Sequence, residues 1–222
     1  MDWNLMKLPN QSYVNLSKIS LYPITSGQAK SIIIKNHYLH TAGACKYAYG
    51  IYFDSFLIGC LTYGYPVGRQ VLTSIFTNIT LEHDKVLELT RLWIADGYGT
   101  NIESWAIGQS FKWLRKNYID ILISYADPLA GHVGSIYQAT NWIYQGNNTM
   151  LIKGYWFYIN GQKMHPRSVV AKYGSIKDNI LIKIDDKYKR VPMEKKHRYI
   201  YILNKKMRKT GKLKHNVKDY PK

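Results

Sequence analysis

The sequence has little cysteine, little acidic charge and no long hydrophobic run. Two of the 222 residues are cysteine, Cys45 and Cys60, and they form no CxxC pair. This scarcity argues against a disulfide scaffold and against a zinc finger. No apolar run reaches the roughly 18 residues that a membrane helix needs, and no signal peptide stands at the amino terminus. We therefore expect a cytoplasmic protein with reduced cysteines and no membrane partner.

The shortage of acidic residues leaves a large positive charge. The chain has 31 Lys and Arg against 14 Asp and Glu, a formal net charge of +17. The segment from Lys187 to Lys222 has 14 basic residues and two acidic ones, Glu194 and Asp219, so its net charge is +12. A solvated tail is one interpretation, and contact with the phosphates of a nucleic acid is the one we favour.

Hydrophobic patterning predicts alternating helices and strands. Thr25 and Gln28 form the signature of a capping box for a helix that ends near Asn36. Asp54-Ser55 separates two strand-like runs and predicts a hairpin. Further strands are expected at residues 70–79, 86–94, 119–123, 142–144, 151–159 and 199–203, and further helices at 101–117 and 131–141. This order is typical of an α/β or α+β layer arrangement, and a split between strands 86–94 and 119–123 would leave a ligand-binding cleft.

The segment from Ser124 to Gly146 carries the densest set of chemically useful residues. An apolar strand leads to Asp127, which could serve as a general base or a metal ligand. His132 lies between glycines at the opening of a predicted helix that contains Tyr137. The alternative is structural, with Asp127 capping a turn and with Tyr137 and Trp142 in the core.

Two further segments of the sequence allow both a functional and a structural interpretation. His37 and Tyr38 follow the first helix, where such a pair can bind a metal or transfer protons, or can be merely structural. With Asp127, and with His132 as an alternative to Tyr38, they could form a facial metal site. Arg91 lies within an apolar strand and needs an anionic partner. That partner is either Glu88, three residues away, or a cofactor or nucleic acid.

These residues carry a resemblance to the Mom-like family of bacteriophage Mu and its relatives. The resemblance covers roughly residues 25–205, and its most specific block lies between Ser124 and Gly146. The matching segments are Asn36-His-Tyr, Glu88-Leu-Thr-Arg-Leu, Ser124-Tyr-Ala-Asp-Pro, Gly131-His-Val-Gly-Ser-Ile-Tyr-Gln-Ala-Thr-Asn-Trp-Ile-Tyr and Lys163-Met-His-Pro-Arg-Ser. It implies a GNAT-like (acyltransferase-like) fold, with a mostly antiparallel mixed sheet split near its middle and helices on both faces. We expect residues 1–186 to form this catalytic domain and residues 187–222 to form a basic extension.

The family's activity supplies the expected function. The resemblance implies transfer of a carbamoylmethyl (acetamido) group to N6 of adenine in phage DNA, which protects that DNA from host restriction in the cytoplasm of the infected bacterium. It implies double-stranded DNA as partner, with the adenine flipped out of the helix, and it allows a homodimer. The expected catalytic residues are His37, Tyr38, Asp127 and Tyr137. By resemblance, iron is an expected metal, held by His37, Tyr38 and Asp127. Substrate contacts are expected from Tyr125, His132 and Trp142.

One segment departs from ordinary GNAT acyltransferases. Their pyrophosphate loop reads Gln/Arg-x-x-Gly-x-Gly/Ala, whereas the stretch from Ala95 to Ser104 lacks this signature and carries Asp96 and Glu103. The expected donor is therefore either acetyl-coenzyme A or a glycyl carrier, with Arg91, Ser104 and Gly108 as the expected contacts. Two alternative functions stay open: an ordinary N-acetyltransferase of a protein or small amine, and a non-enzymatic DNA-binding protein.

Overall fold

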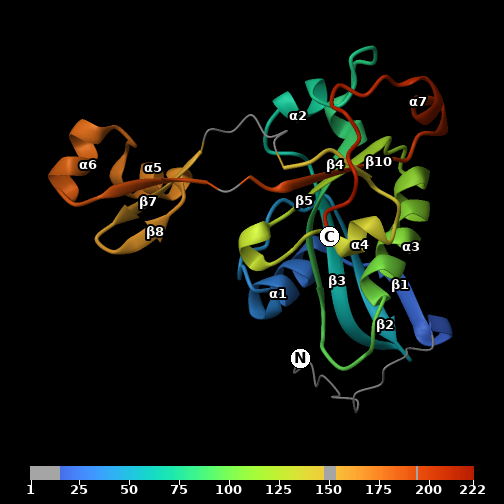
Figure 1. Ribbon diagram of the computed structural model, residues 1–222. Coiled ribbons are helices and arrows are strands. Elements are labelled where there is room, and N and C mark those ends of the chain that lie inside the picture. Colours follow the sequence, from blue (N-terminus) through green and yellow to red (C-terminus); the bar gives the residue numbers. More distant parts are fainter. Residues whose placement is uncertain (1–15, 148–153, 194) are drawn as a thin grey trace.

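The computed structural model describes residues 16–147, 154–193 and 195–222. The described residues form a large body around a seven-stranded sheet and a small lobe (residues 154–193) that projects from one side of it (Figure 1). No helix in the described ranges is both long and apolar enough to cross a membrane.

The large body is built on one mixed sheet in the order β1-β2-β3-β4-β5-β10-β6. Every neighbouring pair is antiparallel except β4 and β5, which are parallel. The strands are β1 (Ile19–Pro23), β2 (Tyr47–Phe53), β3 (Phe56–Gly64), β4 (Val86–Ile94), β5 (Ile121–Ala126), β6 (Ile143–Tyr144) and β10 (His197–Ile202). This pattern confirms the expected mostly antiparallel mixed sheet, including the hairpin at Asp54-Ser55.

The sheet splits between β4 and β5. These two strands pair only from Val86 to Glu88, opposite Ile121 to Ile123. Beyond this point β4 continues along β3 to Ile94, while β5 continues along β10 to Ala126. A β-bulge beside Thr90 adds to the irregularity of β4. The two strands therefore present their later residues to the space between them.

Helices cover both faces of the sheet, as expected. On one face, α3 (Ile102–Lys116) and α4 (Ser135–Gln138) pack on the main core. On the other face lie α1 (Ser26–Asn36) and the segment after α2 (Gln70–Thr73). The remaining elements of the body are α7 (Lys205–Thr210) and the 3-10 turns Leu16–Lys18, His83–Lys85 and Pro128–Ala130. The capping box of α1 is confirmed, since the Thr25 hydroxyl accepts from Gln28 N at 3.2 Å and the Gln28 side chain accepts from Thr25 N at 2.9 Å.

The prediction of a strand at residues 70–79 is wrong. The segment begins with the single helical turn of α2 and then continues irregularly, with only an isolated bridge between Phe76 and Leu213. Its β-branched and aromatic residues are used for burial, because Ile75 and Phe76 are 0% and 4% exposed in the core beneath α2. Burial of such residues therefore outweighed their strand propensity.

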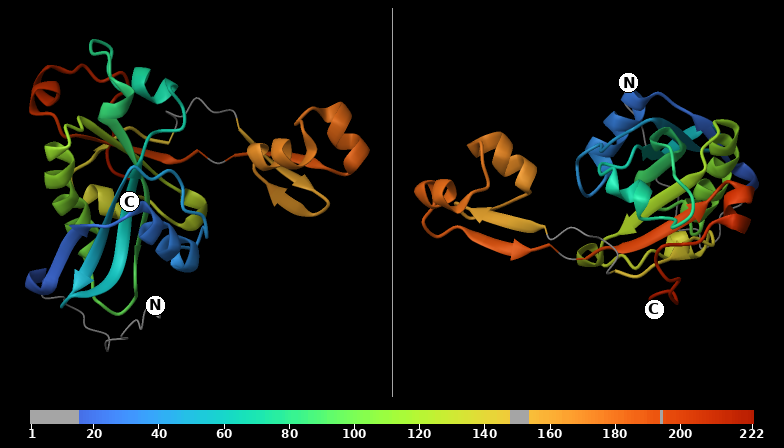
Figure 2. Two further views of the ribbon diagram at one scale, coloured as in Figure 1. Left: turned by 180° about the vertical axis from the view of Figure 1, so that it is seen from behind. Right: turned by 90° about the horizontal axis from the view of Figure 1, so that it is seen from above.

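The small lobe has a separate sheet and a separate core. Its strands β7 (Tyr155–Ile159), β8 (Gln162–Met164) and β9 (Lys189–Pro192) are arranged in the order β8-β7-β9, with α5 (Pro166–Tyr173) and α6 (Asp178–Ile184) beside them. Phe157, Ile159, Val169 and Leu181 form its core. Figure 2 shows it standing away from the main sheet in both views. The boundary expected between residues 186 and 187 falls inside this lobe, because β9 pairs with β7.

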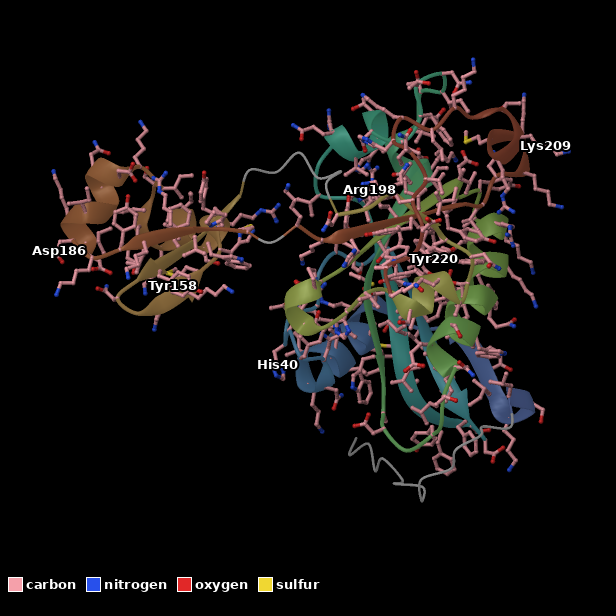
Figure 3. The ribbon with its side chains drawn as sticks, in the orientation of Figure 1. His40, Tyr158, Asp186, Arg198, Lys209 and Tyr220 are labelled. Carbon is pink, nitrogen blue, oxygen red and sulfur yellow. The ribbon has the colours of Figure 1, made fainter. Side chains whose placement is uncertain are left out.

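The basic carboxy-terminal segment is largely integrated into the body. β10 lies between β5 and β6 in the main sheet, so the strand expected at residues 199–203 is confirmed. The last residues fold back, with Lys218 N donating to Tyr144 O at 2.9 Å and the Tyr220 hydroxyl donating to Trp142 O at 2.7 Å. Figure 3 places Tyr220 over the middle of the body. Much of the segment therefore builds the fold.

Candidate functional site

A cavity of about 830 Å³ lies where the sheet splits. Its walls come from β4, the end of β5, the residues after α1, the segment 131–137 and the small lobe. Seven of the ten expected site residues line it: His37, Tyr38, Arg91, Tyr125, Asp127, His132 and Tyr137. The topology thus brings together side chains that are up to 100 positions apart in the sequence (137 − 37).

Three aromatic rings form one wall of this cavity. The rings of His37 and Tyr38 are stacked, with centroids 4.5 Å apart and planes 25° apart. The His132 ring lies 5.8 Å from that of Tyr38 at 56°. Since Tyr38 is 54% exposed, its ring is accessible to a planar partner, for which such a wall is well suited.

His37 is a neutral hydrogen-bond donor in this wall. Burial, with the nearby charges of Arg91 and then His132 and His40, lowers the pKa of His37 to about 4. Its Nδ1 accepts from Leu39 N at 3.1 Å, so the proton of the neutral ring is placed on Nε2. His37 can therefore donate a hydrogen bond from Nε2, whereas proton abstraction requires another group.

Three carboxylates line the cavity and could accept a proton, those of Glu88, Glu103 and Asp127. Asp127 stands directly after β5, and its Oδ2 lies 3.0 Å from the Lys196 ammonium. Its carbonyl accepts from Ala130 N and His132 N, which fixes the turn that follows. On β4, burial raises the pKa of Glu88, an effect that Arg91 and Lys196 partly oppose. A raised carboxyl pKa suits proton transfer near neutral pH.

Tyr137 is positioned by the buried Ser124 hydroxyl. Ser124 Oγ lies 2.8 Å from the Tyr137 hydroxyl and 3.1 Å from Leu89 O, and it can donate to either. Burial raises the pKa of Tyr137 to about 12, although the Ser124 hydrogen bond opposes this. Tyr137 therefore stays protonated at neutral pH and can act as a hydrogen-bond donor. Burial also raises the pKa of Tyr125 to about 12.

Arg91 holds the loop that follows the aromatic wall. Its Nε donates to Thr41 O at 2.8 Å and its Nη2 to Thr41 Oγ1 at 3.1 Å. Its Nη1 donates to Thr90 O at 2.6 Å. No ion pair joins Arg91 to Glu88 among the described residues, so the hydrogen bonds of the guanidinium go to neutral oxygens.

The small lobe and the strand after it also contribute to the cavity. Trp156 and His165 line it from the lobe, with their rings 5.7 Å apart and edge to face. Lys196 and the buried Arg198 line it from the carboxy-terminal segment. We had assigned no site role to these four residues. Nothing local in the sequence marks the return of the chain to the cavity.

Three expected residues do not line the cavity. Trp142 is 0% exposed and packs against Phe111, Tyr137 and Tyr201, so this position is incompatible with the expected stacking on the substrate. Its interior location matches the structural alternative. Ser104 and Gly108 lie on α3, where the Ser104 hydroxyl donates to Asn101 O at 3.1 Å. Their contact with a donor stays a prediction.

The cavity residues do not fit the expected iron site. His37 Nδ1 is already occupied by Leu39 N, and the neutral ring then carries a hydrogen on Nε2, where a metal would bind. Asp127 pairs with Lys196, and Arg91 adds positive charge beside His37. Within the described ranges, no three His, Cys, Asp or Glu side chains are arranged to hold a metal ion. We therefore derive no step through a metal.

Sequence comparison finds one family and one curated relative. Residues 18–222 match the model of the Mom protein family. The chain is 27% identical over 202 residues to the methylcarbamoylase Mom of Escherichia phage Mu, covering 87% of this chain and 80% of that protein.

Structural comparison finds GNAT acetyltransferases among the solved structures. One is a GNAT family N-acetyltransferase from Escherichia coli in complex with CoA, with a TM-score of 0.46 and 8% identity, covering 90% of each chain. Another is the spermidine N-acetyltransferase of Vibrio cholerae, with a TM-score of 0.47 and 10% identity, covering 87% of this chain and 99% of that one. Because the family model matches nearly the whole length of the sequence, the chain belongs to the Mom protein family.

Proposed function

We propose that this protein is a transferase that places a carbamoylmethyl group on N6 of adenine in phage DNA. The observation that carries the proposal is the convergence of His37, Tyr38, Asp127 and Tyr137 on one cavity. Family membership and the name of the phage Mu relative, a methylcarbamoylase, support this choice of product. A volume of about 830 Å³ is within the usual range for small-molecule sites, and it leaves room for a purine and part of a donor.

The target adenine has to leave the double helix to reach this cavity. Its exocyclic amine is otherwise held within the stack and base pair, so base flipping or capture of a single strand is needed. In our proposal the exposed ring of Tyr38 stacks on the purine, and the Nε2 hydrogen of His37 and the hydroxyl of Tyr137 donate to its acceptor atoms. The resulting contacts fix the amine opposite Asp127.

The transfer step requires a proton acceptor because the N6 lone pair is delocalised into the ring. In our proposal a bond forms between N6 and the donor carbon, and the bond between that carbon and its carrier breaks, with the electron pair leaving on the carrier. The N6 proton passes to the Asp127 carboxylate, and Lys196 stabilises the carboxylate before the transfer. For a carbamoylmethyl product the donor carbon is the methylene of a –CH2–CO–NH2 unit that already contains the amide nitrogen and is bonded to a leaving carrier such as coenzyme A. Acetyl transfer from acetyl-coenzyme A, or transfer through the carbonyl of a glycyl carrier, would instead leave an acyl group on N6.

The test is mass spectrometry of nucleosides from the DNA of cells that express the chain. We expect an adenosine derivative heavier by one carbamoylmethyl group, with the substituent on N6. Soluble protein in cells whose adenine stays unmodified would contradict the proposal. An acetyl group found instead on a protein or small amine would support the alternative of an ordinary N-acetyltransferase.

A further inference from the structure

Arg198 is a buried cation at one end of the cavity. It lies on β10, opposite Tyr125 of β5, and is 1% exposed. It lines the cavity together with Ser74, which follows α2. Figure 3 shows Arg198 in the body near α2, on the side that faces the small lobe.

Among the described residues, the guanidinium of Arg198 makes hydrogen bonds only to Ser74. Its Nη2 donates to the Ser74 hydroxyl at 2.7 Å and lies 3.5 Å from the Ser74 carbonyl. The Ser74 hydroxyl in turn donates to Val71 O at 2.7 Å, which holds its oxygen toward the arginine. The Nε of Arg198 is buried and has no hydrogen-bond partner in the part of the chain that the structure describes.

No carboxylate within the described part of the chain neutralises Arg198. Burial lowers the pKa of Arg198, and the phenol of Tyr125 partly opposes this effect. Asp127, the carboxylate at the end of β5, is paired with Lys196 instead. A guanidinium does not lose its proton in proteins, so a buried one retains a charge that needs an anionic partner.

We propose that Arg198 and Ser74 form an anion subsite that binds a phosphate group at the α2 end of the cavity. A phosphate oxygen would accept from the unused Nε, and a guanidinium is suited to recognise phosphate through directed hydrogen bonds. Lys196 adds positive charge to the same cavity. The phosphate belongs either to the DNA backbone beside the flipped nucleotide or to the carrier of the donor. The subsite requires an anionic ligand but does not depend on the chemistry of adenine transfer.

Binding measurements without turnover test this subsite. Arg198→Met removes the charge and keeps an unbranched side chain. Lys209→Gln is the matched control, because it removes one positive charge from an exposed position on α7 that is not among the residues lining the cavity. Each variant and the original chain are titrated with inorganic phosphate, with a short single-stranded oligonucleotide and with coenzyme A.

We expect Arg198→Met to bind inorganic phosphate more weakly than the original chain does. We also expect its affinity for either the oligonucleotide or coenzyme A to fall by about tenfold. Lys209→Gln should lose much less affinity for each ligand. Loss for the oligonucleotide, with a salt dependence shallower by about one charge, assigns the subsite to the DNA backbone. Loss for coenzyme A assigns it to the donor. A folded Arg198→Met chain that binds all three ligands like the original would overturn the proposal.

A second measurement covers the case in which Arg198→Met does not fold. In the unmodified chain, the nuclear magnetic resonance signal of the Arg198 Nε–H is followed while inorganic phosphate is added. We expect a saturable shift of this signal. A signal that does not respond, while other arginine signals do, would overturn the subsite.

Discussion

At the residue scale, His37 links the geometry of the cavity to pH. Its pKa of about 4 lies below the ordinary value of 6.5, so the unfolded chain binds the extra proton more readily between these two values. The contribution of neutral His37 to the free energy of unfolding is therefore fully present above pH 6.5 and is lost as the pH falls toward 4. Denaturant unfolding at several pH values, compared with His37→Gln, measures this contribution. Equal pH profiles for the two chains would contradict it.

Tyr137 allows function to be separated from stability. In Tyr137→Phe the buried Ser124 hydroxyl can still donate to Leu89 O, at 3.1 Å. The substitution therefore leaves Ser124 with a hydrogen-bond partner. We expect a small stability change, about 1 kcal/mol or less, together with a loss of DNA modification of tenfold or more. Thermal unfolding and nucleoside mass spectrometry measure the two quantities. Full modification by the phenylalanine variant would show that the phenol is only structural.

At the scale of elements, α4 depends on a glycine for its position. Gly134 precedes α4 with φ +87°, and a Cβ there would lie 2.4 Å from the Tyr199 ring. We expect Gly134→Ala to destabilise the protein by more than 2 kcal/mol and to lower activity by displacing Tyr137. Gly131→Ala is the control, since its φ is also positive, at +72°, but no atom lies within 4 Å of a Cβ. It should cost only about 1 kcal/mol. Equal stability of the two variants would refute this reading of α4.

Elements specified by local signals could be predicted from the sequence, and those specified by distant packing could not. The capping box of α1 and the hairpin at Asp54-Ser55 depend on neighbouring residues, and both are confirmed. The segment 70–79 was assigned from its β-branched residues, but its conformation is determined by burial of Ile75 beneath α2. The sequence does not predict the separate lobe, because a chain with two hydrophobic cores has the same kind of hydrophobic pattern as a chain with a single core.

The same distinction applies to the site. His37, Tyr38, Asp127 and Tyr137 stand in short patterns that carry the family resemblance, and their convergence follows from the split sheet. Trp142 has an equally suggestive position in the sequence but is buried in the core. Arg198 comes to the cavity only because the late strand β10 inserts between β5 and β6, a long-range pairing that no local pattern specifies.

At the scale of the whole molecule, the two cores predict unequal stability. The small lobe has four fully buried hydrophobic residues in its core, whereas the main core of the body has many more. Because a small unit buries less apolar surface, it opens at a lower free energy. We expect amides of β7 to exchange hydrogen faster than those of β3 and β5, and Leu181→Ala to accelerate exchange only in the lobe. Uniform exchange over both sheets would contradict two separate cores.

In our proposal adenine is modified in the cavity at the split of the sheet, and Asp127 accepts the proton. The most direct measurement is the fraction of N6-substituted adenine in DNA from cells expressing Asp127→Asn, alongside DNA binding by the same purified variant. Asp84→Asn is the matched control, because Asp84 is exposed and is not among the residues lining the cavity. We predict that Asp127→Asn binds DNA but modifies at least a hundredfold less adenine, while Asp84→Asn modifies it normally. Undiminished modification by a soluble Asp127→Asn chain would contradict the account.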